Sequence, residues 1–437
     1  MKRPAILAPY FSCLDSLGGL AWTGRVRKVV GQVVESDGPF CSVGESCEFN
    51  EISGHTLRGE VIGFRGTAVL SMPLASATGL RFGDAVISRG LRPTVGVSEK
   101  LLGRVLDGEG CPMDSLGEVH AESMRPLDGI MTQAMAREPI TESLGCGVRA
   151  MDAFLTCGRG QRIGIFGGSG VGKSTLLGMV ARHTEADLTV LALVGERGRE
   201  VREFIEHSLG PEGLRRSVVV VSTSDQSPLL RIRAAHTATA IAEFFRDRGR
   251  HVLLVLDSLT RLGMAQREIG LAAGEPPTSK GYTPSVLTLM ARMLERAGRF
   301  QQGSITGFYT VLMEGDDQQD PMVDMARSLL DGHIVLDRRL ASENHYPPIA
   351  ILDSVSRLMR AVVAPEHLQR AAALRALLAT YHASEDLVRI GAYQKGGDLE
   401  LDRALAVLPL LNSFLRQTPT EAPSLPESVA QLLAIPV

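Results

Sequence analysis

The chain has 437 residues, 44% of them hydrophobic, and its 46 basic side chains nearly balance 49 acidic ones, giving a formal charge of −3. This length predicts two or three domains with well-filled cores, which excludes a fibrous or largely disordered protein. The near-neutral charge argues against non-specific nucleic-acid binding as the main activity, because such binding needs a basic surface that displaces counterions.

The cysteines and the N-terminal residues indicate a cytoplasmic protein. Scattered cysteines without a Cys-x-x-Cys pair are typical, in a chain this long, of reduced thiols in the cytosol. The N-terminal MKRPAILAPYFSCLDSL is a poor signal peptide, because Pro9 and Asp15 interrupt its apolar run. No apolar stretch is long enough to cross a bilayer, so we expect membrane association only through partners or a surface helix. The cysteines are Cys13, Cys41, Cys47, Cys111, Cys146 and Cys157.

Residues 24–93 are predicted to form a β domain. Short β-type runs, such as VRKVVGQVVES, GEVIGFRG, TAVLSMPL and DAVISRG, are separated by Gly, Ser, Asp and Asn. Many short strands at this spacing indicate a small closed β-barrel or a sandwich. Prolines break residues 91–140, which we interpret as a connector made of loops.

From residue 161 onward, short apolar strands alternate with longer amphipathic stretches. The expected strands are RIGIFG, LTVLALVG, VVVVST, VLLVLD, ITGFYTVLM and HIVLD. Fully apolar strands with helices between them predict a parallel sheet that is buried on both faces. The predicted fold class is therefore α/β.

After Pro365 the sequence becomes helical. HLQRAAALRALLATYH and LDRALAVLPLLNSFLRQ have the apolar spacing of helices, and a Pro-rich tail from Thr418 precedes a last apolar turn. We therefore expect an N-terminal segment, a β-barrel, an α/β domain and a helical domain. Their expected ranges are 1–23, 24–93, 94–364 and 365–437.

The strand RIGIFG runs directly into a glycine-rich loop and then into a predicted helix. The loop fits the phosphate-binding pattern G-x-x-x-x-G-K-[ST] in the strand–loop–helix context that this pattern requires. Its glycines allow successive backbone N–H groups to face an anion, and the helix N-terminus adds a favourable dipole. We expect Lys173 to reach the β- and γ-phosphates of a nucleotide and the Ser174 hydroxyl to bind Mg²⁺. The loop consists of Gly167, Gly168, Ser169, Gly170, Val171, Gly172, Lys173, Ser174 and Thr175.

Two carboxylates follow later strands, at the edge where an open α/β sheet binds its ligands. Asp257 ends VLLVLD, which fits a Walker B aspartate that holds Mg²⁺, with a helix cap as the alternative. Glu196 follows LTVLALVG, the next strand in the sequence after the strand of the phosphate loop, and we expect it to lie within reach of that loop. Its position suits a carboxylate that polarises an attacking water and suits equally a solvated ion-pair cluster, since arginines follow it.

Several longer strings together resemble the type III protein-export ATPases, relatives of the catalytic and regulatory subunits of rotary ATP synthases. The strings cover nearly the whole chain, and the long one from SLTR to TPS is specific to this family. Within it, the chain is most similar to the flagellum-specific ATPase, with the injectisome ATPase as the alternative. The resemblance implies a RecA-like P-loop ATPase core, an N-terminal β-barrel for oligomerisation and a helical C-terminal domain. The strings are GGSGVGKST, VGERGREVREFIE, VVVVSTSDQSP, LVLDSLTRLGMAQREIGLAAGEPPTSKGYTPSV, VLMEGDDQQDP, LLDGHIVL and NHYPPIAILDSVSR.

The resemblance also implies roles for individual residues. Glu196 matches the water-polarising catalytic carboxylate, and Asp257 matches the Walker B aspartate. Arg197 would contact the γ-phosphate or couple to the neighbouring site. Arg357, in SVSR, matches an arginine finger that enters the site of the adjacent subunit. Tyr346, in NHYPP, matches an aromatic residue that stacks on adenine.

Other matches concern coupling between sites and partners. Arg261, in SLTR, corresponds to a site-coupling arginine, and Phe414 to the other side of the adenine pocket. Residues 316–321 correspond to a loop that faces a central pore. Residues 391–402 take the place of the acidic lever of the ATP synthase subunit, although they are fewer and less acidic.

The implied activity is Mg²⁺-dependent ATP hydrolysis that drives export of flagellar proteins through a type III secretion apparatus, by releasing chaperones and delivering substrates to the export gate. A finger supplied in trans ties hydrolysis to assembly, so we expect a homo-oligomer, by resemblance a homohexamer. The expected partners are a stator-like regulatory protein at Leu7–Leu20, a central-stalk protein, the export gate and chaperone–substrate complexes, with no specific nucleic acid. The expected location is the cytoplasm, at the cytoplasmic face of the inner membrane.

Three other functions fit parts of the sequence. A non-catalytic ring subunit typically replaces the catalytic glutamate, whereas Glu196 is present here. A ring that translocates RNA or DNA would need an aromatic and basic stripe, which the barrel with its single Trp22 lacks. An ATP synthase catalytic subunit is the nearest enzymatic alternative, but one chain carrying both Glu196 and Arg357 favours a homomeric ring.

Overall fold

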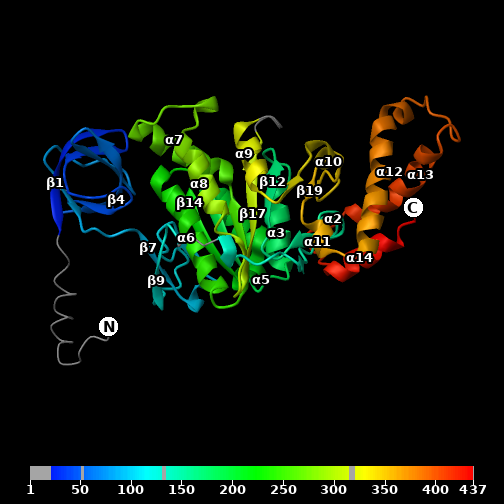
Figure 1. Ribbon diagram of the computed structural model, residues 1–437, viewed down its shortest axis with the longest axis horizontal. Helices are drawn as coiled ribbons and strands as arrows, with labels where there is room; N and C mark the ends of the chain where they lie inside the picture. The colour runs from blue at the N-terminus through cyan, green and yellow to red at the C-terminus, as the bar shows by residue number, and fades with distance from the viewer. Residues whose placement is uncertain (1–20, 51–53, 130–133, 314–319, 437) are drawn as a thin grey trace.

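The structure, a computed structural model, describes residues 21–50, 54–129, 134–313 and 320–436. The β-barrel, the central α/β domain and the C-terminal helices follow one another along its longest axis (Figure 1). Within the described ranges, none of the helices combines the length and the apolar character needed to span a membrane. Most of the predicted N-terminal segment, residues 1–20, lies outside the described residues.

The N-terminal β domain is a closed barrel with strand order β1-β2-β5-β4-β3-β6, so the barrel and not the sandwich is observed. Strands β3 and β6 alternate buried and more exposed residues, as expected when one face points inward, whereas β5 is buried throughout. Val26, Val34, Cys47, Phe49 and Val86 form its small core. The strands are β1 (Trp22–Val30), β2 (Val33–Asp37), β3 (Ser46–Asn50), β4 (Thr56–Arg65), β5 (Ala68–Pro73) and β6 (Ala85–Ser88).

The connector was predicted to consist of loops, and this is wrong in part. Strands β7 (Thr94–Val97) and β9 (Ser123–Pro126) form an antiparallel pair, and β8 (Val105–Asp107) joins the edge of the central sheet beside β14. Leu106, at the middle of β8, is fully buried there. A strand of three residues is too short to give a periodic signal in the sequence. Residues 105–107 form a strand because they pair with β14, a contact that the local sequence does not reveal.

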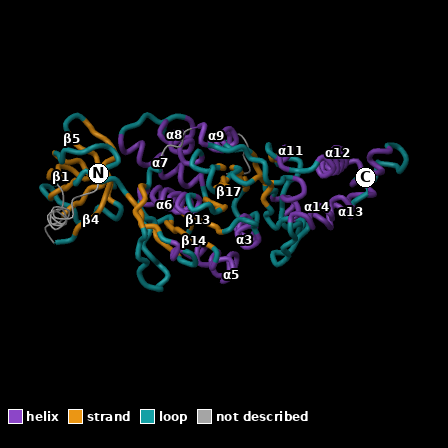
Figure 2. The backbone as a smooth tube through the Cα atoms, turned by 60° about the horizontal axis from the view of Figure 1, so that its bottom comes forward, coloured by secondary structure: helices purple, strands orange, loops and turns teal. Residues whose placement is uncertain are grey.

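The central sheet confirms the predicted α/β fold, with the order β19-β18-β12-β17-β15-β13-β14-β8 and parallel pairing from β18 to β8. Successive residues along its strands enter two separate cores, which explains why the strands are apolar throughout. Helices α6 to α9 cover one face, and α3 and α5 lie on the other (Figure 2). The strands are β12 (Arg162–Gly167), β13 (Leu188–Glu196), β14 (Ser217–Thr223), β15 (His251–Asp257), β17 (Ser304–Leu312), β18 (Gly332–Val335) and β19 (Val355–Ser356).

The remaining elements of this domain are mostly helices. The α-helices are α2 (Arg149–Phe154), α3 (Lys173–His183), α4 (Gly198–Glu203), α5 (Gly210–Arg215), α6 (Pro228–Arg246), α7 (Leu259–Ala273), α8 (Pro284–Leu294), α9 (Pro321–Leu329), α10 (Arg338–Ser342) and α11 (Met359–Val362). A π-helix, η4 (Phe204–Leu209), links α4 to α5. Short elements are β10 (Ser143–Leu144), β11 (Cys157–Gly158), β16 (Gly298–Arg299), η2 (Glu99–Leu101), η3 (Ala134–Ala136) and η5 (Ser279–Gly281).

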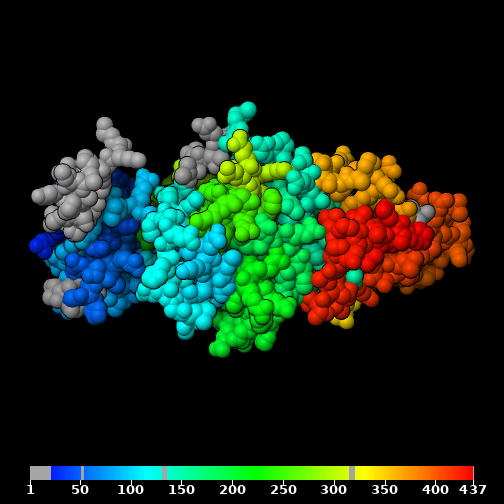
Figure 3. All heavy atoms as spheres, turned by 90° about the horizontal axis from the view of Figure 1, so that it is seen from below, coloured from blue at the N-terminus to red at the C-terminus, as the bar shows by residue number. Residues whose placement is uncertain are grey.

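The C-terminal part consists of α12 (Pro365–Arg389), α13 (Leu399–Leu415) and α14 (Leu425–Ala434). The last apolar turn expected after Thr418 is instead the ten-residue helix α14. Ser424 caps this helix, with Glu427 completing a reciprocal capping box that satisfies two backbone donors. In the space-filling view of Figure 3, the C-terminal helices lie beside the α/β domain, at the end away from the barrel.

Candidate functional site

The phosphate loop leaves the carboxyl end of β12 and enters α3 at Lys173. Gly170 and Gly172 have φ values of +77° and +101°, in the left-handed region that favours glycine. Nothing lies within 4 Å of a Cβ built at Gly170, so the backbone conformation, not a lack of space, selects glycine there. Ser169, Gly170, Ser174 and Thr175 are exposed, so the outer side of the loop is open to solvent.

Lys173 and Asp257 form a buried ion pair at the centre of the site. Lys173 Nζ lies 2.8 Å from Asp257 Oδ1, and the two side chains are 11% and 5% exposed. Thr310 Oγ1 donates a hydrogen bond of 2.6 Å to the same carboxylate oxygen. Asp257 does not cap helix α7, because the Ser258 side chain fills that position. The carboxylate is therefore directed toward the phosphate loop and not toward a helix end.

Glu196 ends strand β13, but β13 is not a neighbour of the phosphate-loop strand. Strands β17 and β15 lie between β12 and β13, which places the two strands about 14 Å apart across the sheet. Glu196 is within electrostatic reach of Lys173 and Asp257 because β13 runs beside β15 and extends past it. Glu196 is therefore near the phosphate loop, as expected, although its strand is not the neighbour of the phosphate-loop strand in the sheet.

The surroundings of Glu196 raise the pKa of its carboxyl from 4.5 to about 7. Burial is the main cause, and the negative charge of Asp257 adds to it, while Lys173 and Arg261 act in the opposite direction. Arg261 Nη2 donates a hydrogen bond of 3.2 Å to Glu196 Oε2, and its Nη1 donates to the carbonyl oxygen of Gly195. A partly buried carboxyl group with a pKa near neutrality, beside a specific charged partner, is typical of a catalytic acid or base.

Arg197 is not among the side chains that converge on the loop. Its side chain is 78% exposed and lies 3.8 Å from Glu200. The cation that contacts Glu196 is instead Arg261, in the first turn of α7, the helix that follows β15. The sequence offered the SLTR match for Arg261 but no signal for its pairing with Glu196, since the two residues are 65 positions apart.

Tyr346 lies beside the phosphate loop, whereas Phe414 is packed into a core. A Cβ built at Gly172 would lie 3.6 Å from Tyr346 Cε1, and 42% of Tyr346 is exposed, which leaves its ring available to a ligand. Phe414 is buried, with its ring centroid 6.3 Å from that of Phe154. Gln417, which the sequence did not indicate, donates its backbone N–H to the carbonyl of Tyr346 at 2.8 Å.

Arg357 lies at the opposite end of the sheet from the phosphate loop. Its backbone N–H donates to the carbonyl of Asp331, and the N–H of Asp331 donates to the carbonyl of Arg162, the first residue of β12. The loop begins at Gly167, five residues further along this strand, which corresponds to about 16 Å. Arg357 is exposed, and its Nη2 donates a hydrogen bond of 3.2 Å to the carbonyl of Arg327 in α9.

The oxygen ligands near the loop fit Mg²⁺ only in combination with a nucleotide. Within the described ranges, no three His, Cys, Asp or Glu side chains are grouped as metal ligands. The Ser174 hydroxyl and the Asp257 carboxylate are hard oxygen donors, and Mg²⁺ is typically held by one or two such ligands together with water and phosphate oxygens. The donor set therefore suits a metal that arrives with ATP.

Family models match the chain in the same order as its three parts. The β-barrel domain of the ATP synthase alpha/beta family matches residues 26–90, and the nucleotide-binding domain of that family matches residues 147–356. The T3SS EscN ATPase C-terminal domain matches residues 363–434. A flagellum-specific ATP synthase from Bacillus subtilis (strain 168) is 50% identical over 427 residues, 97% of each chain. The chain belongs to the type III protein-export ATPase family.

A secretion ATPase and two solved structures support the same family assignment. A type 3 secretion system ATPase from Sinorhizobium fredii is 47% identical over 407 residues, 93% of this chain and 90% of the relative. The assembled ATPase EscN of the enteropathogenic E. coli type III secretion system is 43% identical, with a TM-score of 0.88 over 94% of this chain and 99% of EscN. EscN in complex with its central stalk EscO gives a TM-score of 0.87, at 43% identity and with the same coverage. The predicted family and the RecA-like architecture are confirmed.

Proposed function

We propose that this protein is the ATP hydrolase of a flagellar type III export apparatus. The observation that carries the activity is the convergence, at one edge of a parallel sheet, of the phosphate loop, the Lys173–Asp257 pair and a carboxyl group of raised pKa at Glu196. The flagellar role is supported by relatives named flagellum-specific ATP synthase, 50% identical over 97% of the chain in one case. The injectisome ATPases are the second candidate, supported by identities of 47% and 48%.

The phosphate loop and its two central side chains would hold the nucleotide. Backbone N–H groups of the loop and Lys173 Nζ would bind the β- and γ-phosphates, which requires Lys173 to exchange Asp257 for phosphate oxygens. Ser174 and the released Asp257 would then hold Mg²⁺, which when bound neutralises charge on the phosphates. Tyr346, beside Gly172, would stack on the adenine.

Glu196 would position the attacking water. Its carboxylate must be ionised to accept a hydrogen bond from the water, and its distance from the loop is set by the strand pair β13–β15. Arg261 holds the Glu196 side chain through a hydrogen bond and so limits the orientations it can take. We assign Glu196 the role of catalytic base and Arg261 that of positioning it.

Arg357 would act on the neighbouring subunit. Because it lies at the far end of β12 from its own phosphate loop, it cannot neutralise the γ-phosphate of that site. A head-to-tail ring, which we propose to be a homohexamer, would bring it into the next site. EscN, whose assembled form and complex with a central stalk are solved, supports the ring and a stalk partner.

The remaining proposed features concern partners and domain boundaries. We propose that the barrel at residues 24–93 contributes to ring formation and that the ATPase and helical domains divide near residue 364. Of the proposed pore-facing loop, residues 316–321, residues 316–319 lie outside the described residues, as does the proposed stator-binding segment Leu7–Leu20. Chaperone release, delivery to the export gate and a position at the membrane face follow from the proposed role.

The substitution Glu196→Gln tests the catalytic assignment. It removes the carboxylate but keeps its size, so we expect ATP binding within about twofold of wild type and turnover reduced by about 10² or more. Phosphate release and binding of a fluorescent ATP analogue measure the two quantities. Glu206→Gln is the matched control, because Glu206 pairs with Arg202 on an exposed helix face, where both side chains are at least half exposed. Retained turnover in Glu196→Gln would assign the base to another residue.

A further inference from the structure

The finger segment, residues 350–357, is attached to the α/β domain by hydrogen bonds along one side. Ser356 Oγ accepts a bond of 3.2 Å from the side-chain amide of Gln161. Ser354 Oγ accepts a bond of 2.9 Å from the backbone N–H of Val335, on strand β18. The segment also pairs with β18 as strand β19. These contacts fix the position of the segment along the edge of the sheet. All three are made with residues of the α/β domain.

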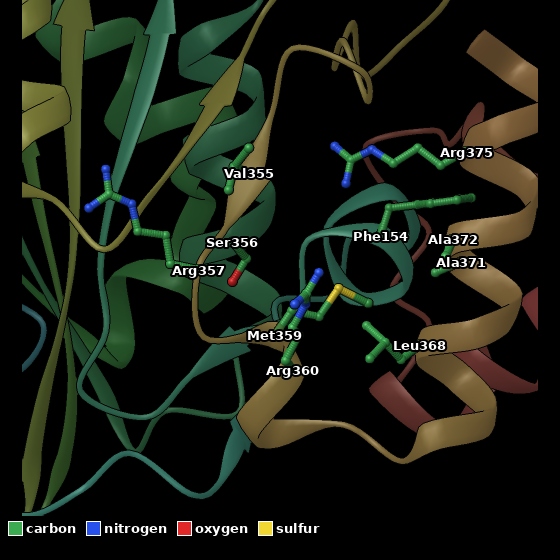
Figure 4. A pocket seen from close by; sticks show the side chains of 10 residues that line it. All are labelled: Phe154, Val355, Ser356, Arg357, Met359, Arg360, Leu368, Ala371, Ala372 and Arg375. Carbon is green, nitrogen blue, oxygen red and sulfur yellow. The ribbon is translucent and has the colours of Figure 1, made fainter.

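On the other side, a side chain of the C-terminal helices forms hydrogen bonds to the same segment. Arg375, on α12, donates from Nη2 to the backbone carbonyls of both Ile351 and Ser354. Ser354 precedes Arg357 by three residues. Figure 4 shows Arg375 extending from α12 toward this segment, while the side chain of Arg357 points the other way, toward the sheet.

Next to these hydrogen bonds, the packing between α12 and the finger segment is open. A cavity of about 500 Å³ lies between them, with Val355 and Met359 on one wall and Leu368 and Ala371 of α12 on the other. Direct side-chain packing therefore holds the two elements together only in part. The bonds from Arg375 cross the gap and add to the apolar packing of Ile351 against Ala371 and Leu374 of α12.

We propose that Arg375 is a positioning residue for the arginine finger, and that it makes the placement of Arg357 in the neighbouring site depend on the position of α12. This inference rests on the proposed action of Arg357 in trans. A movement of the C-terminal helices would be transmitted through Arg375 to the finger segment, and from there to hydrolysis in the next subunit. The site that loses activity when Arg375 is removed is therefore the neighbour's site.

The kinetic signature of such a role is specific. Arg357 acts on charge that develops in the transition state, so a misplaced finger lowers kcat and leaves KM nearly unchanged. Misplacement by about 1 Å costs up to about 10²-fold in rate, and we expect Arg375→Met to lower kcat by about ten- to a hundredfold. Both bonds come from one nitrogen, so the single ammonium of Arg375→Lys can replace them in part, and this variant should retain more activity than Arg375→Met.

The matched control lies on the same helix. Arg370 also donates from its guanidinium to a backbone carbonyl, that of Ile435, but it does not contact the finger segment. Arg370→Met removes the same chemical group and a similar bond, so we expect its kcat to stay within about twofold of wild type. Thermal melting and sizing of each variant show whether it folds and assembles.

Mixed assemblies show on which subunit Arg375 acts. Lys173→Ala removes ATP binding in its own site but leaves Arg375 and Arg357 intact, so it can lend a well-placed finger to a neighbour. Mixed with Arg375→Met at equal amounts, it should raise the activity per Arg375→Met subunit to about half that of wild type, because half of those sites then face an intact finger. Arg357→Ala mixed with Lys173→Ala is the positive control.

Each outcome bears on a different claim. If Arg357→Ala is fully active, the finger assignment in the proposed function is wrong. If Arg357→Ala is slow and is rescued by Lys173→Ala, but Arg375→Met keeps normal kcat, the positioning role is wrong on its own. If Arg375→Met is slow, folded and assembled but gains nothing from Lys173→Ala, Arg375 acts within its own subunit and the inference fails.

Discussion

At the scale of single residues, Glu196 combines two demands that oppose each other. In its proposed role its carboxyl must be ionised to polarise water, yet burial and the charge of Asp257 favour its protonated form and raise its pKa to about 7. Arg261, which donates to it at 3.2 Å, lowers the pKa again. The balance leaves a base that titrates near the working pH of a cell, where a general base is most effective.

The rate should therefore depend on pH through Glu196. We expect kcat/KM to rise with pH through a midpoint of about 7, because the active form is the ionised one. Measurement of phosphate release from pH 5.5 to 8.5, at roughly constant ionic strength, gives the midpoint. Arg261→Ala removes a cation beside the carboxylate and should move the midpoint to higher pH. A flat profile, or a shift to lower pH in Arg261→Ala, would contradict this account.

The same shift has a consequence for stability. The folded chain binds a proton at Glu196 more tightly than the unfolded chain, so ionisation of Glu196 lowers the free energy of unfolding as pH rises from about 4.5 through 7. The contribution of Glu196 to the free energy of unfolding is fully present below the pKa of the unfolded chain, 4.5. It is lost as the pH rises through the pKa of the folded chain, about 7. Glu196→Gln has no such group, so its melting temperature relative to wild type should be higher above neutral pH than at low pH.

At the scale of elements, α2 connects the C-terminal helices to the α/β domain. Arg149, in α2, donates from Nε to the carbonyl of Phe414 at 2.8 Å and from Nη2 to that of Arg416 at 2.5 Å, and its Nη1 pairs with Glu421 at 2.7 Å. Gln417 reinforces this junction by donating to the carbonyl of Gly147 at 2.8 Å. One short helix thus satisfies several acceptors at the end of α13.

Arg149→Ala should loosen this junction. Loss of a charged donor from several backbone carbonyls costs about 2 kcal/mol, which corresponds to about thirtyfold more frequent local opening. Limited proteolysis within α13 and α14 should accelerate by this factor. Arg202→Ala is the control, because Arg202 pairs with Glu206 on an exposed helix face, and such pairs contribute about 0.5 kcal/mol or less. Equal cleavage rates for the two variants would contradict the anchoring role of α2.

Local signals account for what could be predicted. The apolar runs of β12 to β18 and the glycine pattern of the phosphate loop are encoded within ten residues or so, and the structure has these elements at the predicted places. Strand order is not local: β17 and β15 lie between β12 and β13, and β8 joins the sheet from the connector. The pairing of Arg261 with Glu196 and of Lys173 with Asp257 depends on that order, so the separate residues could be predicted but their contacts could not.

At the scale of the whole molecule, the phosphate loop follows one end of β12 and Arg357 lies near the other, so the proposed action of Arg357 in trans requires two chains for a complete site. Wild-type specific activity should therefore rise with protein concentration as chains assemble. Arg357→Ala should stay slow at every concentration, by about 10³-fold or more, because assembly brings no finger to its sites. Turnover measured across dilutions, alongside sizing of the same samples, checks both statements. Specific activity independent of concentration in a monomeric sample would contradict them.

If Arg357 acts in trans as proposed, its position near the far end of β12 also means that closing the ring adds one more working site. In an open arc of n copies, each junction completes one centre, so the arc holds n − 1 working centres and one terminal copy binds nucleotide without hydrolysing it. Joining the two ends of the arc completes the last active site without adding another subunit. An incomplete arc therefore carries one idle nucleotide, and only a closed circle uses every copy it contains.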